Sequence, residues 1–282
     1  MLPISIKKFA HHPLTSIIKY PATIDYVGVE HNGRSIQWAI AGGMLTGSKW
    51  NGAVEFYDAA TSALFGQHSL KPIRPVVSWE SEHHGYVVGA RWVAAPRRIV
   101  AGCIDGVVVQ IDPFSNETDP NETEVDELNE SVHVLFRHPH PVYRIDARCV
   151  EGSECSLRCV SASTIGQIVL VEVDVSSGEA VACGQWAHAG RVTAVALGPS
   201  FIVSAGFDGS CCVWDMRLKL ATTQLQNNTD ASQTSDEVIG SIAINNDGSL
   251  VATGMLDEGV RVYDMRKCSQ PLFTDSVRTV SH

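Results

Sequence analysis

Short apolar runs separated by turn residues recur along the chain, and the clearest set lies between residues 192 and 214. Val192–Leu197, Phe201–Ala205 and Cys211–Trp214 are four to six residues long, which is too short for helices and typical of strands. An Asp208-Gly209 pair separates the second run from the third. Asp-Gly between apolar runs is the strongest short hairpin signal, because such turns need positive φ. The runs alternate only weakly, so we expect antiparallel strands that are buried on both faces.

This pattern recurs in units of four short strands, and the search for such repeats comes before any other assignment of fold. An Asp follows the third run of each unit, at spacings of about 40 to 60 residues: Asp58, Asp112, Asp174, Asp215 and Asp264. The predicted strands are, unit by unit, Tyr26–Val29, Ile36–Ala41, Ala53–Tyr57 and Ala63–Gln67; Tyr86–Val93, Arg98–Ala101, Val107–Ile111 and Val132–Phe136; Val142–Ala147, Arg158–Ala162, Ile168–Val173 and Ala180–Gln185; Val192–Leu197, Phe201–Ala205, Cys211–Trp214 and Ala221–Leu225; Ile239–Ile244, Leu250–Thr253, Val260–Tyr263 and Leu272–Thr274.

These units resemble the WD40 repeat family. The resemblance is carried by His188 before the first strand, Ser204 in the second, Asp208 in the turn, and Trp214-Asp215 at the end of the third. It implies an all-β propeller of four-stranded blades, in which Asp, His, Ser and Trp of one blade form a hydrogen-bonded chain. A buried Trp N–H and a buried Ser hydroxyl each need a partner, so we interpret His188, Ser204, Asp208 and Trp214 as structural.

The predicted domain organisation is a propeller over residues 24–282, preceded by an N-terminal segment, residues 1–23. Five blades, followed by what resembles the first strand of a sixth, fall short of the usual seven, and a propeller avoids exposed sheet edges by closing. We expect a truncated seven-bladed ring or, less favoured, a smaller or split ring. A strand near Ser16–Tyr20 is a candidate for closing the ring. The acidic residues 115–130 include no aromatic side chain and are predicted to be a disordered insertion.

The connection between the second and third strands of the first unit is long. It runs from Gly42 to Gly52, whereas most hairpin loops have about two to five residues. We predict a long loop that carries Trp50. Because Trp dominates interface hot spots, an exposed Trp50 would be a binding anchor. The alternative is that Trp50 folds back onto the blade and seals it.

Composition narrows the classes of partner. The formal net charge is −10, which disfavours a nucleic-acid binder and suits basic partners. No apolar run approaches the ~18 residues of a membrane span, and the N-terminus has no secretion signal. We therefore expect the eight cysteines to be reduced thiols and the protein to reside in cytoplasm and nucleus.

The chain shows no recognisable catalytic constellation. It contains no glycine-rich phosphate loop, no Gly-x-Ser-x-Gly elbow and no His-Glu-x-x-His motif. His138 and His140 have a metal-like spacing, but no third ligand lies near them in sequence, so we expect no metal and no cofactor. We predict a protein without enzymatic activity, although a fold alone does not decide function.

Within the WD40 family, the N-terminal half is similar to the WD-repeat subunits of the methylosome, the partners of type II protein arginine methyltransferases. The most specific stretch is Leu45–Phe56, LTGSKWNGAVEF, with the Trp at the same place. This resemblance implies a non-catalytic scaffold that docks the methyltransferase through Trp50, flanked by Ser48 and Lys49. It also implies help in presenting arginine-rich substrates such as histone tails and Sm proteins.

Other functional classes stay open. Trp214-Asp-Met-Arg217 and Tyr263-Asp-Met-Arg266 resemble the Trp-Asp-x-Arg box of substrate receptors in cullin–RING ubiquitin ligases. In that class Asp215, Arg217, Asp264 and Arg266 would contact the ligase adaptor, but many unrelated WD40 repeats carry the box. Two further alternatives are a WD40 scaffold of another complex and an unrecognised hydrolase.

Overall fold

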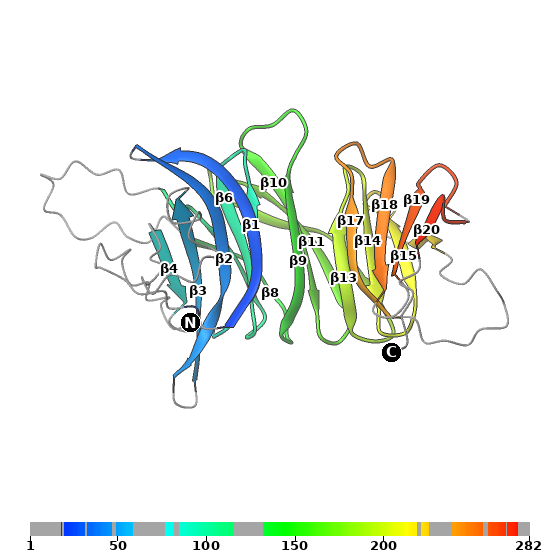
Figure 1. The fold of residues 1–282 in the computed structure, drawn as a ribbon, viewed down its shortest axis with the longest axis horizontal. Coiled ribbons are helices and arrows are strands. Elements are labelled where there is room, and N and C mark those ends of the chain that lie inside the picture. The colour runs from blue at the N-terminus through cyan, green and yellow to red at the C-terminus, as the bar shows by residue number, and fades with distance from the viewer. Residues whose placement is uncertain are drawn as a thin grey trace, which may run out of the picture. The chain divides into compact units, whose positions relative to one another are not determined.

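The computed structural model describes residue 18 and residues 20–31, 33–46, 49–58, 77–81, 85–114, 132–218, 221–225, 238–255, 259–268 and 270–275. All regular secondary structure in these residues consists of β-strands (Figure 1). The strands form five four-stranded antiparallel sheets, numbered sheet 1 to sheet 5 along the chain. In each sheet, strands that follow one another in the chain lie side by side. The predicted all-β class with four-stranded units is confirmed.

The strand bounds are as follows. Sheet 1 contains β1 (Tyr20–His31), β2 (Arg34–Thr46), β3 (Lys49–Asp58) and β4 (Val77–Ser81); sheet 2 contains β5 (Val87–Val93), β6 (Arg98–Cys103), β7 (Val107–Ile111) and β8 (Val132–Arg137). Sheet 3 contains β9 (Val142–Cys149), β10 (Ser156–Ser163), β11 (Gln167–Asp174) and β12 (Ala180–Ala187); sheet 4 contains β13 (Val192–Leu197), β14 (Phe201–Gly206), β15 (Cys211–Asp215) and β16 (Ala221–Gln224); sheet 5 contains β17 (Ile239–Ile244), β18 (Leu250–Met255), β19 (Gly259–Asp264) and β20 (Phe273–Asp275).

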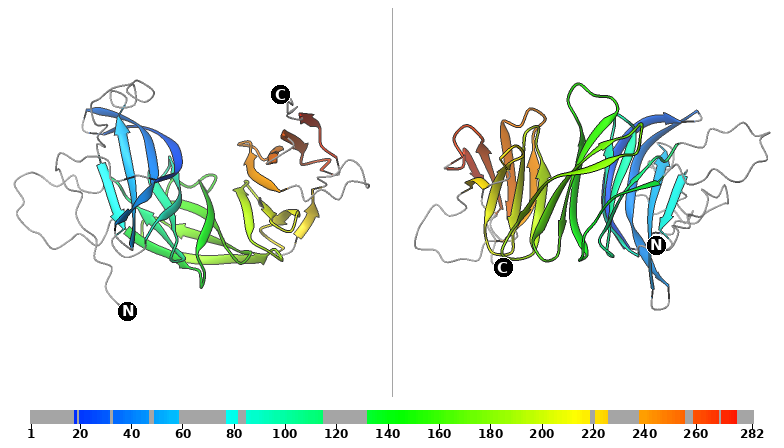
Figure 2. Two further views of the ribbon diagram at one scale, coloured as in Figure 1. Left: turned by 60° about the horizontal axis from the view of Figure 1, so that its bottom comes forward. Right: turned by 180° about the vertical axis from the view of Figure 1, so that it is seen from behind.

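The chain divides into two compact units. The first comprises residues 1–142 and 174–179 and holds sheets 1 and 2; the second comprises residues 143–173 and 180–282 and holds sheets 3, 4 and 5. In the first unit, apolar side chains such as Phe56 and Trp92 pack sheet 1 against sheet 2. In the second, one core cluster joins sheets 3 and 4 and another joins sheets 4 and 5 (sheet 5 is orange to red in Figure 2).

Sheet 4 is therefore covered on both faces. Every residue of β13 is buried, and in β14 only Phe201 is partly exposed. A strand that packs against neighbouring sheets on both sides has no polar face, so its sequence does not alternate. The expectation of strands buried on both faces is confirmed.

The predicted strands of sheets 2 to 5 agree with the structure to within about three residues at most ends, because local turn chemistry marks their limits. In the β14–β15 turn, Gly209 has a φ of 77°. The Asp208 carboxylate accepts a hydrogen bond from the Ser210 N–H at 3.0 Å, which closes the turn. The Asp-Gly pair thus marks the hairpin that the sequence indicated, but the expectation of positive φ at both central positions is wrong, because only Gly209 has it.

The predicted fourth strand of sheet 1 is wrong. Ala63–Gln67 lies outside the described residues, and β4 occupies the fourth place, paired with β3 through Val54 and Trp79. Trp79 is 3% exposed and belongs to the core of the first unit. Burial of this large indole favours β4 as the outer strand. The candidate ring-closing strand near Ser16–Tyr20 falls largely outside the described residues.

The predicted long loop at residues 42–52 is also wrong. β2 and β3 remain paired from Ile36 and Asp58 out to Thr46 and Lys49, so most of these residues are strand. The glycines serve close packing: a Cβ on Gly43 would collide with the Asn51 carbonyl oxygen, and one on Gly52 with the Gly85 carbonyl oxygen. Glycine inside a strand permits such an approach of another backbone. Here it does not mark a loop.

All eight cysteines are free thiols. Cys103, Cys159 and Cys211 are fully buried, and burial raises the pKa of each thiol, that of Cys159 to about 12. They act as small apolar residues. The acidic residues 115–130 lie outside the described residues. In the part of the chain that the structure describes, no helix has the length and hydropathy needed to cross a membrane.

Candidate functional site

Sheet 4 contains a continuous chain of polar side chains that runs from a surface turn into the core. Trp214 Nε1 donates to Ser204 Oγ at 2.7 Å, and Ser204 Oγ lies 2.7 Å from His188 Nε2. His188 Nδ1 lies 2.8 Å from Ser210 Oγ, which donates to Asp208 Oδ1 at 2.5 Å. The structure thus brings together the four residues that the sequence singled out, with Ser210 inserted between Asp208 and His188.

The strands of sheet 4 position this chain. His188 precedes β13, Ser204 lies in β14, and Trp214 lies in β15 opposite Ile202. Ser204 is fully buried, the His188 side chain is 1% exposed, and Trp214 packs in the core between sheets 3 and 4. Buried polar groups need hydrogen-bond partners, and here each finds one inside its own sheet.

The hydrogen bonds fix the direction of the chain. Ser210 donates its hydroxyl proton to Asp208, so Ser210 Oγ must accept from His188 Nδ1. The proton of a neutral His188 is then on Nδ1, and Nε2 accepts from Ser204. Ser204 in turn accepts from Trp214. Every proton in the chain has an acceptor only in this arrangement, which makes His188 neutral with a defined tautomer.

The electrostatics agree with a neutral histidine. Burial lowers the pKa of His188, and Asp208, with Oδ1 3.6 Å from Nδ1, opposes that shift. For Asp208, partial burial acts to raise the pKa, but hydrogen bonds from Ser210 and the Ala189 N–H lower it overall. A serine, a histidine and an aspartate in one hydrogen-bonded chain superficially suggest that Ser204 is a catalytic nucleophile. Ser204 is fully buried, however, so its Oγ is not exposed to a substrate, which favours the structural role that the sequence predicts.

Ser210 is the member of this chain that sequence reasoning missed. A local signal for it exists, because the triplet Asp-Gly-Ser recurs at residues 247–249. There the Ser249 N–H and hydroxyl both donate to Asp247 Oδ1, at 2.9 and 2.8 Å. A serine two positions after a turn aspartate can therefore be expected to bind that carboxylate.

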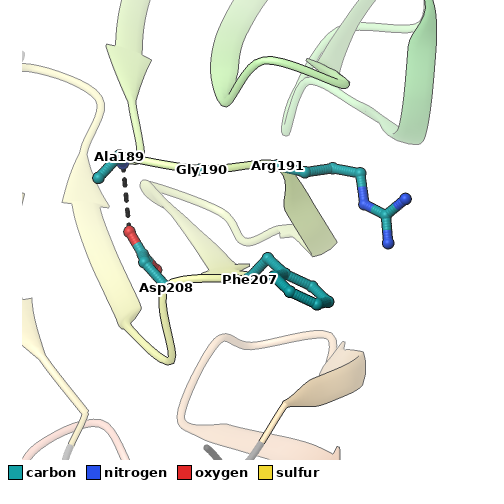
Figure 3. A pocket seen from close by; sticks show the side chains of 5 residues that line it. All are labelled: Ala189, Gly190, Arg191, Phe207 and Asp208. Carbon is teal, nitrogen blue, oxygen red and sulfur yellow. Dashed lines mark hydrogen bonds between the residues drawn. The ribbon is translucent and has the colours of Figure 1, made fainter.

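A pocket of about 510 Å³ opens beside the outer end of the chain (Figure 3). Its lining residues are Ala189, Gly190, Arg191, Phe207 and Asp208, and the Ala189 N–H donates to Asp208 Oδ2 at 3.2 Å. The Arg191 guanidinium lies over the rings of Tyr143 and Phe207, 4.6 and 5.5 Å from their centroids. Phe207 is 60% exposed, so this surface offers an aromatic and a cation to a partner.

A second candidate contact surface is a two-stranded arm, defined as residues 44–46 and 49–51 (Figure 1). β1 pairs with β2 only as far as Gly43, and β4 pairs with β3 only as far as Gly52. Beyond these glycines, β2 and β3 pair only with each other among the residues that the structure describes. Trp50 stands opposite Leu45 in this arm, and Lys49 opposite Thr46. Leu45 is 46% exposed, while Ser48 lies outside the described residues.

Residues 182–215 and 226–264 match the family model described as WD domain, G-beta repeat. The first of these segments contains the whole polar chain from His188 to Trp214. These two segments, which make up less than half of the chain, are similar to WD40 repeats. No curated protein matches the chain. The five four-stranded sheets have the architecture of the WD40 β-propeller class.

The second WD40 repeat keeps the strands but changes the polar chain. In sheet 5, Tyr263 pairs with Val251 as Trp214 pairs with Ile202 in sheet 4, and Thr253 takes the place of Ser204. Thr253 Oγ1 is buried, and no hydrogen-bond partner reaches it from the residues that the structure describes. Sheet 5 therefore forms its four strands without the complete polar chain seen in sheet 4.

The ligase-box residues make local contacts in their own turns. Arg217 Nη2 lies 2.9 Å from Asp215 Oδ2 and Arg217 Nε donates to Asp215 Oδ1 at 3.2 Å, while 81% of the Arg217 side chain is exposed. Hydrogen bonds from Arg217 lower the pKa of Asp215 to about 2. In sheet 5 the Arg266 N–H donates to Asp264 Oδ1 at 2.9 Å.

The described residues include no cluster of three or more His, Cys, Asp or Glu side chains arranged to hold a metal ion. His138 is buried and packs edge-on against Phe136, with ring centroids 4.9 Å apart, whereas His140 is exposed. The two histidines of this pair thus lie in different environments.

Proposed function

We propose that the protein is a non-catalytic scaffold that docks a type II protein arginine methyltransferase through the arm. The coarser part of this function follows from its WD40 repeats, which are typical of protein-interaction scaffolds. The observation that carries the finer part is the arm itself. It extends beyond the other strands of sheet 1 and places Trp50 opposite an exposed Leu45.

The physical chemistry of the arm supports a docking role. An isolated two-stranded hairpin is at best marginally stable in water, so the arm gains stability when a partner covers it. Its outer edges carry backbone groups that no neighbouring strand of sheet 1 pairs. A Trp at the centre of a buried interface commonly dominates the binding free energy. In the proposed complex Trp50 is that anchor, with Ser48 and Lys49 beside it.

The charge of the chain supports a role in presenting substrates. Its formal net charge of −10 attracts arginine-rich segments such as histone tails and Sm proteins. Complementary charge raises association rates and selects between partners more than it adds affinity. The proposed complex acts in cytoplasm and nucleus, where thiols stay reduced.

The decisive experiment measures binding of the purified chain to a purified type II arginine methyltransferase by calorimetry. We expect Trp50→Ala to weaken binding about 30-fold or more, the effect of losing a hot-spot residue of about 2 kcal/mol. Ile24→Ala is the matched control, because Ile24 is 59% exposed on β1 of the same sheet and lies outside the arm. Unchanged affinity of Trp50→Ala would show that the arm is not the anchor, and no binding by the unaltered chain would refute the whole proposal.

The ubiquitin-ligase alternative rests on the exposed guanidinium of Arg217. Because this group is 81% exposed, it is accessible to an adaptor protein even while it pairs with Asp215. Capture of the tagged chain from extract separates the two functions. Recovery of a cullin adaptor that is lost in the Arg217→Ala, Arg266→Ala double variant would favour the ligase, and recovery of a methyltransferase would favour the scaffold.

A further inference from the structure

The cation in the pocket beside sheet 4 is held by aromatic rings instead of a carboxylate. The Arg191 guanidinium lies over Tyr143 and Phe207, with its central carbon 4.6 and 5.5 Å from the two ring centroids. No carboxylate forms an ion pair with Arg191 among the residues that the structure describes. Aromatic rings contact the face of a guanidinium and leave its N–H edge open. Because Arg191 is exposed, a ligand can reach that edge.

A second guanidinium adds positive charge at the same place. The Arg144 guanidinium also lies over Tyr143, 4.4 Å from its ring centroid, so the two charges are within roughly 10 Å, the Debye length at 0.1 M salt. Arg144 Nε donates to the Thr193 carbonyl oxygen at 2.8 Å, and Nη1 donates to the Tyr143 carbonyl oxygen at 3.2 Å. Two cations this close repel each other, and an anion bound beside them offsets that repulsion.

Asp208 brings a negative charge to the pocket, but its carboxylate is engaged within sheet 4. Oδ1 accepts hydrogen bonds from the N–H and the hydroxyl of Ser210, and Oδ2 accepts one from the Ala189 N–H. In Figure 3 the Asp208 carboxylate points toward Ala189, whereas the Arg191 side chain extends away from it. Arg191 is therefore the charge that is left to recognise a ligand.

The surface around Arg191 is apolar. Phe207 is 60% exposed, and Ile165, in the turn between β10 and β11, is 52% exposed. The segment that holds Gly190 contacts both turns, because a Cβ on Gly166 would lie 2.5 Å from the Gly190 carbonyl oxygen and one on Gly190 would lie 4.0 Å from Phe207 Cβ. The pocket volume of about 510 Å³ is in the range of about 300–1,000 Å³ that is usual for ligand sites. An apolar side chain thus fits here while an attached anion reaches the guanidinium.

We infer that this surface binds an acidic segment of a protein partner, in which an Asp or Glu stands next to a bulky apolar residue. The carboxylate accepts two parallel N–H bonds from Arg191, whose planar fork matches its geometry. The apolar side chain packs against Phe207 and Ile165. The remainder of this acidic chain repels such a segment, which confines binding to this surface. The inference is independent of the arm and of the proposed methyltransferase, and it adds a partner opposite in charge to the arginine-rich substrates.

The test is an NMR titration of the full chain with blocked peptides. The peptide acetyl-Gly-Ser-Asp-Leu-Asp-Gly-Ser-amide should give saturable shifts of the Arg191 side-chain N–H and the Phe207 ring. The Asn-Leu-Asn and Asp-Gly-Asp analogues should each bind at least about tenfold more weakly, because one lacks the charge and the other lacks the apolar side chain. Added salt should weaken binding of the first peptide more than that of the Asn analogue.

Arg191→Gln removes the charge and should lower the affinity for the first peptide at least about tenfold, while Arg191→Lys, which lacks the planar fork, should restore only part of it. Arg217→Gln is the matched control, because Arg217 is an exposed arginine that pairs with Asp215 and lies outside the pocket. Unchanged affinity in Arg191→Gln would overturn the inference. Equal binding of the Asp and Asn peptides to the unaltered chain would do so too, and that comparison needs no variant to fold.

Two further probes separate the acidic segment from other ligands. An arginine-rich peptide that shifts the same signals as strongly as the first peptide would assign recognition to Asp208. Inorganic phosphate or a short RNA that binds as tightly as the first peptide would assign the surface to phosphate groups. Either result contradicts a site for an acidic protein segment, whereas weaker binding of all three supports it.

Discussion

Replacing Ser204 by Ala is the most direct test of the polar chain in sheet 4. The substitution removes the acceptor of the Trp214 N–H and the donor to His188 Nε2 in one step. Both orphaned groups sit in a region where Ser204 is fully buried and the His188 side chain is 1% exposed. Neither group can turn to water without a rearrangement of the sheet.

The expected cost follows from these two losses. A buried polar group without a partner costs about 1–3 kcal/mol, so the two together cost about 2–6 kcal/mol. Removing the serine hydroxyl also removes its own desolvation cost, which offsets about 1–2 kcal/mol. We therefore expect Ser204→Ala to lower the free energy of unfolding by about 1–4 kcal/mol, whereas removal of an exposed hydroxyl changes it by less than about 0.5 kcal/mol.

Urea unfolding, followed by both Trp fluorescence and circular dichroism, measures this difference as a shift of the midpoint at constant slope. Ser200→Ala is the control, because Ser200 lies in an exposed turn of the same sheet. In a Trp214→Phe background, which lacks the indole N–H, the cost of Ser204→Ala should shrink by about 1–2 kcal/mol. A loss no larger than that of Ser200→Ala, or equal losses in both backgrounds, would refute the role assigned to the chain.

Three further predictions concern protonation, thiol reactivity and the ligase box. Because burial lowers the pKa of His188 below its unfolded value near 6.5, the unfolded chain binds more protons and stability falls as the pH drops through about 6.5. Thermal melts from pH 7.5 to 5.5 should show a weaker pH dependence for His188→Gln than for the unaltered chain; an equal dependence would contradict a depressed pKa. Cys103, Cys159 and Cys211 should resist iodoacetamide in the folded protein and react in urea, whereas the exposed Cys149 and Cys155 react at once, as peptide mass mapping will show. Arg217→Ala should leave the urea midpoint nearly unchanged, since exposed ion pairs contribute little to stability, and a clear drop in the midpoint would mean that the pair does more than close its turn.

The sequence by itself determined most of the architecture of sheets 2 to 5. Asp208-Gly209 and the short apolar runs on either side specify strand, turn and strand through local preferences, which do not depend on the rest of the chain. The resemblance to the WD40 repeat family marked His188, Ser204, Asp208 and Trp214, and a buried Trp N–H and a buried Ser hydroxyl each need a partner. Only Ser210, whose hydroxyl intervenes between Asp208 and His188, went unnoticed.

Tertiary structure decided the rest, where the outcome depends on what lies next to a segment in space. Gly43 and Gly52 suggested a loop, yet they belong to paired strands because the Gly85 backbone packs against Gly52. β4 holds the fourth place in sheet 1 because Trp79 fills the core of the first unit. Turn chemistry is local and can be read along the chain, whereas close packing joins residues far apart in sequence and becomes visible only in three dimensions.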